Sequence, residues 1–175
     1  MNLSTVTVFG GTGFLGHEIV QALTQNGGQV RMAARRKREV GPNEPHVESI
    51  EADIRDRDSV ARALEGAEAA VNAVSLYTEQ RHLGFKDIHV DGARILAEEA
   101  EKAGITRLIH VSGIGVDTRH PSKYIRARAR GEQAVRQAAS GATILRPSVL
   151  FGPGDDFLST LDQVTRLPVV PLFGR

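Results

Sequence analysis

The sequence predicts an α/β fold, a doubly wound parallel sheet of the Rossmann type, on three observations. Short apolar runs alternate with longer segments of helical period, which is the pattern of repeated β-α-β units. A glycine-rich turn follows the first apolar run. The composition, 41% hydrophobic and 25% charged residues with no cysteine, is that of a globular domain that folds without disulfides. In such a fold, ligands bind beyond the carboxyl ends of the strands.

The elements are expected in this order along the chain. The strands are the short apolar runs at residues 5–9, 29–34, 47–51, 69–74, 107–111 and 142–145. The helices are the segments between them at residues 13–25, 59–64, 85–102 and 122–139, followed by one more at 155–166. In the first helix, Leu15, Ile19 and Leu23 lie four residues apart and predict one apolar face. The polar stretch 35–46 contains two prolines and is expected to be irregular.

The strongest functional signal is the turn between the first strand and the first helix, which consists of Gly10, Gly11, Thr12, Gly13, Phe14, Leu15 and Gly16. It satisfies the pattern G-x-G-x-x-G in the strand-turn-helix context that the motif requires. Glycine lets the backbone approach a pyrophosphate, whose charge is stabilised by free N–H groups at the start of the helix. We therefore expect these residues to bind a dinucleotide. The alternative is an ordinary glycine turn.

The end of the second strand indicates which dinucleotide is preferred. NAD sites place Asp or Glu there, whereas this chain has Arg35 and Arg36 and no acidic residue. Because an arginine can pair with a 2′-phosphate, we expect NADP(H), with NAD(H) and a solvated basic loop as the alternatives. After the third strand, Asp53 could accept a hydrogen bond from the adenine amine or could cap the following turn.

A candidate catalytic group lies farther along the chain. Ser112 lies at the carboxyl end of the fifth strand, directly after residue 111. Tyr124 and Arg128 lie four residues apart on one face of the fourth helix. A cation beside a phenol favours the phenolate form and so assists proton transfer, and Ser112 could hydrogen-bond a substrate oxygen. A solvated helix face is the structural alternative. The histidines fit no common zinc spacing, so no metal site is expected.

Several motifs in the same order resemble the extended and atypical short-chain dehydrogenase/reductases, which include the NAD-dependent epimerases and dehydratases. They are GGTGFLG, the Arg35 position, Ala52-Asp53-Ile54, His89-Val90-Asp91-Gly92-Ala93, Leu108-Ile109-His110-Val111-Ser112, the Tyr124 segment and Arg146-Pro147-Ser148-Val149-Leu150-Phe151-Gly152-Pro153. The segment from Tyr124 to Glu132 is similar to the branch that contains the nucleotide-binding accessory subunit of respiratory complex I and its bacterial relatives.

This resemblance implies a Rossmann domain that holds NADP(H). The cofactor residues that it implies are Asp53 and Ile54 beside the adenine, Ala73 and Val74 along the cofactor, and Pro147, Ser148 and Val149 near the nicotinamide. One position departs from the family, because Arg128 stands where the catalytic members have the lysine of Tyr-x-x-x-Lys. Arginine supplies positive charge, but it cannot join a lysine-type proton relay.

The resemblance also implies two domains. We expect residues 1–152 to form the dinucleotide-binding domain and residues 153–175 to begin a carboxyl-terminal substrate domain, most of which is missing from the chain. The apolar stretch LPVVPLFGR, residues 167–175, is expected to be covered by further chain or by another subunit.

Two functions follow from these observations. The first is an NADP(H)-binding protein that holds the nucleotide as a structural or sensing ligand and docks on a larger assembly such as a respiratory complex. The second is an NADP-dependent oxidoreductase or nucleotide-sugar epimerase in which Tyr124 is the acid/base, Ser112 orients the reacting oxygen and Arg128 replaces lysine.

Charge and hydropathy make other classes unfavourable. The net charge is +1 and no aromatic residues interleave with the arginines, which argues against nucleic-acid binding. The start of the chain lacks the features of a secretory signal, and no apolar run has the length of a membrane span. We expect a cytoplasmic protein, which the resemblance would place at the inner membrane through a partner.

Overall fold

The computed structural model describes residues 5–166, except for the side chains of residues 156 and 157. Its strands are β1 (Thr5–Phe9), β2 (Gln29–Ala34), β3 (Val47–Glu51), β4 (Ala69–Asn72), β5 (Arg107–Val111) and β6 (Thr143–Leu145). Its helices are α1 (Phe14–Gln25), α2 (Arg57–Leu64), the π-helix η1 (Asp87–Gly92), α3 (Ala93–Lys102), α4 (Lys123–Ala138) and α5 (Asp156–Thr165). The expected stretch 167–175 lies outside the described residues.

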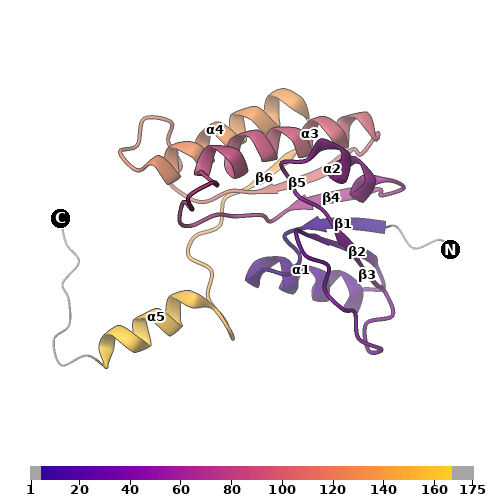
Figure 1. Ribbon diagram of the computed structural model, residues 1–175, viewed down its shortest axis with the longest axis horizontal. Helices are drawn as coiled ribbons and strands as arrows, with labels where there is room; N and C mark the ends of the chain where they lie inside the picture. Colours follow the sequence, from indigo (N-terminus) through magenta and orange to yellow (C-terminus); the bar gives the residue numbers. More distant parts are fainter. Residues whose placement is uncertain (1–4, 167–175) are drawn as a thin grey trace.

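The six strands form one parallel sheet in the order β3-β2-β1-β4-β5-β6. Helix α1 covers one face of the sheet, whereas α2, α3 and α4 cover the other (Figure 1). The strand order reverses between β1 and β4, which is where ligands bind in doubly wound sheets. The predicted Rossmann fold is therefore confirmed.

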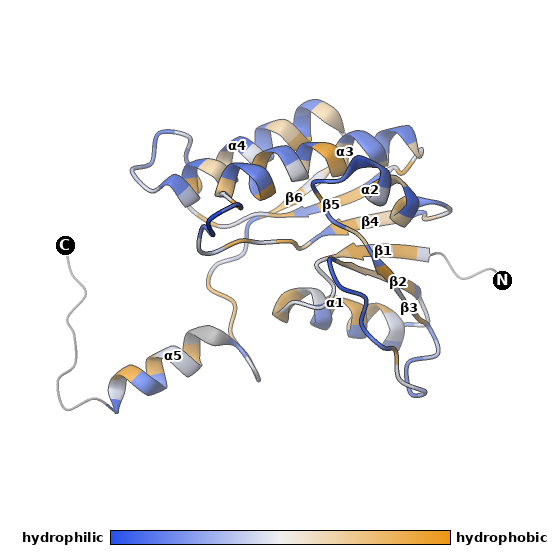
Figure 2. Cartoon of the chain, in the orientation of Figure 1, coloured by the Kyte–Doolittle hydropathy of each residue, from blue (hydrophilic) through white to orange (hydrophobic). Residues whose placement is uncertain are grey.

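Side chains alternate between the two layers along each central strand, as the period of a strand requires. Val8, Met32 and Val71 pack in the α1 layer with Val20, whereas the neighbouring Phe9, Ala33 and Ala70 belong to the cluster beneath α2 and α3. Figure 2 shows mainly hydrophobic strands between helices in which hydrophilic and hydrophobic residues alternate. Within residues 5–166, no helix is both long and apolar enough to cross a membrane.

Several expected boundaries were wrong for local reasons. Strand β4 ends at Asn72 rather than at 74, because the Asn72 side-chain oxygen accepts a hydrogen bond from the Val74 N–H (3.1 Å) and turns the chain. Helix α2 begins two residues earlier than expected, because the Asp56 carboxylate caps it by accepting from the Asp58 N–H. Strand β6 begins at Thr143, since a turn bond from the Ala142 N–H to the Ala139 carbonyl precedes it.

The largest difference from expectation lies in the segment that was expected to be one α-helix over 85–102. The π-helix η1 replaces its first part, and Ile88 and His89 are both buried there. Two glycines permit close packing around it. A Cβ on Gly92 would lie 2.8 Å from the Ile54 side chain, and a Cβ on Gly131 of α4 would lie 1.9 Å from the His89 carbonyl oxygen. Short π-helices are rare in proteins, and those that occur are often found at functional sites.

Candidate functional site

The glycine loop (residues 10–16) lies at the carboxyl end of β1, where the strand order reverses. Gly10 has a φ of +79°, a backbone conformation that favours glycine. A Cβ on Gly10 would also lie 3.0 Å from the backbone between Ala73 and Val74. Gly16 is packed more tightly still, because its Cβ would be 2.0 Å from the Gly10 carbonyl oxygen. The glycines therefore set the close approach of α1 to β1.

The start of α1 is open to an anion. Gly13 is its N-cap residue, no side chain caps it, and no acidic residue lies in the first turn. A Cβ on Gly13 would meet only the Gly10 carbonyl oxygen, at 3.4 Å, so the space beside this residue is largely free of protein atoms. Free amides at a helix start with unfilled space beside glycine fit a phosphate group. Thr12 and Phe14 are exposed next to this space, and Leu15 is half-buried.

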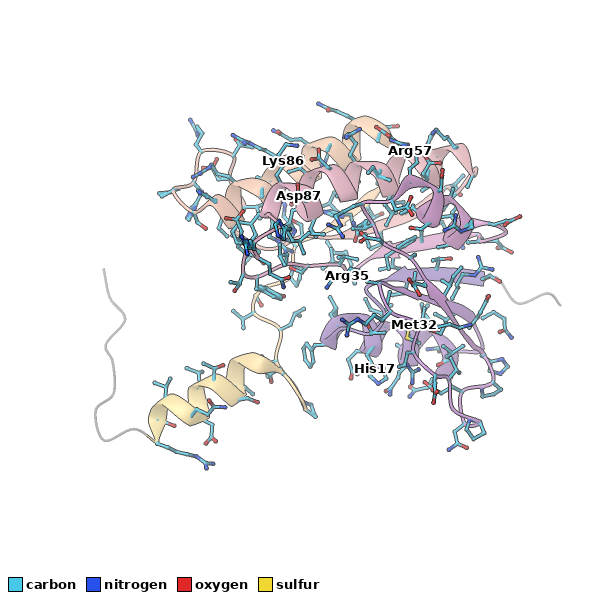
Figure 3. All side chains as sticks on the ribbon, in the orientation of Figure 1. His17, Met32, Arg35, Arg57, Lys86 and Asp87 are labelled. Carbon is cyan, nitrogen blue, oxygen red and sulfur yellow. The ribbon has the colours of Figure 1, made fainter. Side chains whose placement is uncertain are left out.

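The basic residues after β2 lie at the same edge of the sheet. Arg35 and Arg36 are exposed, and Figure 3 shows Arg35 at the carboxyl ends of the strands. Within the described part of the chain, neither makes a hydrogen bond or an ion pair with another residue, whereas Arg38 nearby pairs with Glu44. Two guanidinium groups thus remain available for a ligand phosphate.

Asp53 is engaged by the turn that follows β3. Its carboxylate accepts hydrogen bonds from the backbone N–H of Arg55 (2.9 Å) and from the Arg55 guanidinium (2.6 Å). These hydrogen bonds from Arg55 lower the pKa of Asp53, and the charge of Arg35 acts in the same direction. The turn-capping alternative for Asp53 is thus realised in the structure. The Ile54 side chain is 4% exposed and packs in the core, so only the main chain of Ile54 could contact a cofactor.

The remaining cofactor candidates border the loop or the end of β6. Ala73 and Val74 are half-buried beside Gly10. The Pro147 carbonyl accepts a hydrogen bond from the Ile114 N–H (2.9 Å), which ties the segment after β6 to the end of β5. Ser148 and Val149 are exposed beyond it. Gly152 approaches the Phe14 ring, so this segment passes close to the start of α1.

Tyr124 and Arg128 form a hydrogen-bonded pair on α4, as their spacing predicted. Arg128 Nη1 donates to the Tyr124 hydroxyl oxygen (3.0 Å) and to Ser75 Oγ (3.1 Å), and Nη2 donates to the Val111 carbonyl (3.4 Å). The Arg128 residue is only 8% exposed. Its guanidinium is thus held by acceptors from three parts of the chain and is largely occupied by the protein itself.

Ser112 does not join this pair. It is 2% exposed, and its hydroxyl forms no hydrogen bond of normal geometry with the described residues. It lies close to the buried Glu132, whose carboxylate binds Arg146 through two hydrogen bonds (2.8 and 2.5 Å). Burial alone would raise the pKa of Glu132, but the hydrogen bonds from Arg146 and the proximity of Ser112 hold it below its usual value.

The sequence interpretation missed an aromatic cluster around Tyr124, defined by Tyr77, Phe85, His89 and Tyr124. The Tyr124 ring centroid lies 5.9 Å from that of Tyr77, 5.4 Å from that of Phe85 and 5.4 Å from that of His89. Tyr77 comes from the segment after β4, Phe85 from the helical turn just before η1, His89 from η1 and Tyr124 from α4. They have no common spacing in the sequence, so no pattern could have revealed the cluster.

Two buried histidines lie beside this region, and they make the stability of the fold pH-dependent. Burial lowers the pKa of His89 and of His110 to about 4. Each is hydrogen-bonded, His89 Nε2 with the Leu76 carbonyl (2.9 Å) and His110 Nδ1 with the Asn72 amide (3.1 Å). Both are therefore uncharged at neutral pH.

The free energy of unfolding is expected to fall as the pH drops from about 6.5 to about 4. The unfolded chain binds protons at the ordinary histidine pKa, before the folded chain does, and each histidine can contribute up to about 3 kcal/mol of this loss. Urea unfolding between pH 5 and 6.5 measures it, above the range where most carboxylates titrate. His110→Gln should reduce the slope, and the exposed-site control His82→Gln should leave it unchanged. Equal slopes in all three proteins would contradict this assignment.

Comparison with known proteins shows the family. The family model described as NAD(P)H-binding matches residues 10–160, which is most of the chain. The chain belongs to this NAD(P)H-binding family. Within residues 5–166, no group of three or more His, Cys, Asp or Glu side chains is arranged to hold a metal ion.

Curated relatives of this NAD(P)H-binding chain are longer than the chain itself. It is 35% identical to NADH dehydrogenase (ubiquinone) 1 alpha subcomplex subunit 9, mitochondrial, of Mus musculus, over 95% of this chain and 46% of the relative. It is also 35% identical to a ceramide reductase of Caulobacter vibrioides, over 97% of this chain and 54% of the relative. The chain thus spans about half the length of the curated relatives it matches. The predicted likeness to the accessory subunit of respiratory complex I is confirmed by the first of these relatives.

Solved structures share the fold. The Bordetella bronchiseptica enzyme WbmH, in complex with NAD+, superposes with a TM-score of 0.74 at 18% identity, over 93% of this chain and 63% of that chain. A Bacillus halodurans protein described as an NAD-dependent epimerase/dehydratase has a TM-score of 0.71 at 24% identity, over 87% of this chain and 74% of that chain. At such identities the likeness supports the fold alone.

Proposed function

We propose that this family member binds NADPH in preference to NADH and retains it as a structural or sensing ligand. The observation that carries the preference is the pair Arg35 and Arg36, exposed at the end of β2 without a partner among the described residues. A 2′-phosphate would gain bidentate, charge-assisted hydrogen bonds there, whereas an NADH ribose would find no carboxylate in the stretch 30–37.

The contacts that this proposal assigns run along the carboxyl edge of the sheet. The loop residues Gly10, Gly11, Thr12, Gly13, Phe14, Leu15 and Gly16 hold the pyrophosphate. The adenine lies against Asp53 and the main chain of Ile54, the nicotinamide half passes Ala73 and Val74, and Pro147, Ser148 and Val149 lie beside the nicotinamide. Bound nucleotide would stabilise the folded state by mass action, which gives the site a role without turnover.

The environment of Arg128 supports a non-catalytic role. Ser75, Tyr124 and the Val111 carbonyl already accept hydrogen bonds from its guanidinium, and arginine cannot take part in a lysine-type relay. A relative of similar sequence is a subunit named for NADH dehydrogenase. We therefore place the chain in a larger assembly of that kind, in the cytoplasm and next to the inner membrane through its partner.

The proposal includes a two-domain organisation. Residues 1–152 form the dinucleotide-binding domain, and residues 153–175 begin a second segment. Several apolar side chains at the end of β6 and after it are exposed, which suits packing against such a segment; they are Leu145, Val149, Leu150, Phe151 and Leu158.

Replacing both Arg35 and Arg36 by alanine is expected to weaken NADPH binding about tenfold or more and to leave NADH binding nearly unchanged, because only NADPH carries the 2′-phosphate. Calorimetric titration with each nucleotide measures this. Arg107→Ala is the control, since Arg107 is an exposed arginine at the amino end of β5, whereas Arg35 and Arg36 follow the carboxyl end of β2. Tighter binding of NADH than of NADPH by the unmodified protein would refute the preference.

A second function, an NADP-dependent oxidoreductase, is favoured by the bond from Arg128 to the Tyr124 oxygen and by the likeness to a ceramide reductase. A bound nicotinamide would exchange a hydride with the substrate. Tyr124 would hold the transferable proton, and Arg128 would orient the phenol.

Tyr124→Phe separates the two functions. Under both, NADPH affinity should stay within about twofold, because the variant loses only a hydroxyl. If the protein is an enzyme, oxidation of NADPH by carbonyl substrates should fall at least a hundredfold. Tyr77→Phe, which removes the other tyrosine hydroxyl of the chain, should retain turnover. Equal rates for Tyr124→Phe and the unmodified protein would exclude Tyr124 as the acid/base.

A further inference from the structure

The aromatic cluster presents one ring to solvent beside the Tyr124 hydroxyl. Tyr77 is 77% exposed, although its ring centroid lies 5.9 Å from that of the half-buried Tyr124. Phe85, which lies just before η1, packs edge-on against Tyr124, with 5.4 Å between the two ring centroids. An exposed aromatic ring that continues a packed group of rings is a surface suited to a further apolar or flat group.

The segment that carries Tyr77 is held in place at both of its preceding residues. Ser75 Oγ accepts a hydrogen bond from Arg128 (3.1 Å), and the buried His89 ring binds the Leu76 carbonyl (2.9 Å). Leu76 itself is buried in the core. Tyr77 is thus displayed from a fixed backbone, so its exposure is a feature of the packed structure around η1 and α4.

The basic side chains in and near the aromatic cluster are already engaged by other groups of the protein or are uncharged. Arg128 donates to Ser75, Tyr124 and Val111, and His89 is uncharged because burial lowers its pKa to about 4. Arg126, two residues before Arg128 on α4, donates to the carbonyls of His120 and Pro121. None of these side chains is free to bind a phosphate or a carboxylate.

Two hydroxyl groups remain at the cluster, the exposed Tyr77 O–H and the Tyr124 O–H beside Arg128. The Tyr124 oxygen accepts from Arg128, and no acceptor for the Tyr124 proton is present among the described residues. A phenol can accept and donate at the same time, so this proton is available to a ligand oxygen. The chemistry of the cluster therefore combines aromatic faces with two phenol donors, of which the Tyr124 O–H is the one oriented by Arg128.

We propose that Tyr77, Phe85 and Tyr124 form a subsite for an apolar carbonyl compound, whose hydrocarbon part lies on the Tyr77 ring and whose oxygen accepts the Tyr124 O–H. The inference deepens the oxidoreductase alternative and rests on the proposed nucleotide site for its biological use. It makes nucleotide sugars weaker ligands of this subsite than apolar carbonyl compounds, because Arg128, the cation that contacts the cluster, is already engaged by acceptors of the protein.

Tyrosine fluorescence tests the proposal directly, because the chain has two tyrosines and no tryptophan, and both tyrosines belong to the cluster. The probes are octan-2-one, octanoate and UDP-glucose, each titrated into the unmodified protein, Tyr77→Phe and Tyr77→Ala. Octan-2-one should give a saturable change in the first two proteins, and its affinity should fall about tenfold in Tyr77→Ala. Octanoate and UDP-glucose should bind at least tenfold more weakly than octan-2-one.

Equal affinity of octan-2-one for the unmodified protein and Tyr77→Ala, or no saturable change, would overturn the subsite, as would tighter binding of UDP-glucose. A parallel NADPH titration separates this outcome from the nucleotide proposal. NADPH affinity should be the same in all three proteins, which also shows that Tyr77→Ala is folded. If octan-2-one binds as expected but NADPH does not bind, the proposed function fails and the subsite stands.

Discussion

Gly16→Ala is expected to abolish NADPH binding and to destabilise the fold by about 3 kcal/mol. The added Cβ would lie 2.0 Å from the Gly10 carbonyl oxygen and 2.7 Å from its carbon, so α1 or the loop must move. Backbone atoms cannot yield as a flexible side chain can, and the movement would displace the amides that we assign to the pyrophosphate. Chemical denaturation and NADPH fluorescence titration measure the two effects.

Gly13→Ala separates binding from folding at the same loop. Gly13 has a φ of −81°, and its Cβ would meet only one protein atom, at 3.4 Å. The variant should unfold within about 0.5 kcal/mol of the unmodified protein, yet it should bind NADPH at least tenfold more weakly, because the methyl group occupies the space assigned to the phosphates. Normal NADPH affinity in Gly13→Ala would place the pyrophosphate elsewhere.

Gly131→Ala is expected to have the largest effect on stability outside the glycine loop, again about 3 kcal/mol or more. Its Cβ would lie 1.9 Å from the His89 carbonyl oxygen, so α4 could no longer pack against η1. The same displacement would separate His89 and Tyr124, whose rings meet edge-on at 5.4 Å. Urea unfolding measures the loss of stability.

Gly141→Ala is the matched control for Gly131. It lies in the turn after the same helix, and no atom lies within 4 Å of its added Cβ. It should change the free energy of unfolding by no more than about 0.5 kcal/mol. A similar small effect of Gly131→Ala would show that α4 and η1 are not packed as closely as described.

The sequence predicted the sheet and its order of elements well because these depend on local patterns. Alternating side chains along β1 bury Val8 and Phe9 on opposite faces of the sheet, as the strand period requires. Gly104 takes the left-handed conformation that is common for a glycine after a helix, with a φ of +73°. In α1, however, the buried residues are Gly16 and Val20, whereas Ile19 and Leu23 lie at the flank of the core. Spacing alone could not show which side of the helix faces the sheet.

The candidate site was less predictable because its geometry depends on tertiary contacts. Tyr124 and Arg128 meet through local helical spacing, so the sequence could place them together. Ser75 and His89 act through contacts with distant elements. Gly92 and Gly131 lie within recognisable segments, but nothing in those segments shows which backbone or side chain they approach. Ser112 directly follows the expected strand, but its burial near Glu132 follows from the packing of α4.

The most direct test of dinucleotide binding is native mass spectrometry of the purified protein after equilibration with equal concentrations of NADPH and NADH. One NADPH per chain is expected for the unmodified protein, and little or no nucleotide is expected for Gly13→Ala. A protein that retains no nucleotide, or that retains the same amount after Gly13→Ala, would contradict binding at the glycine loop.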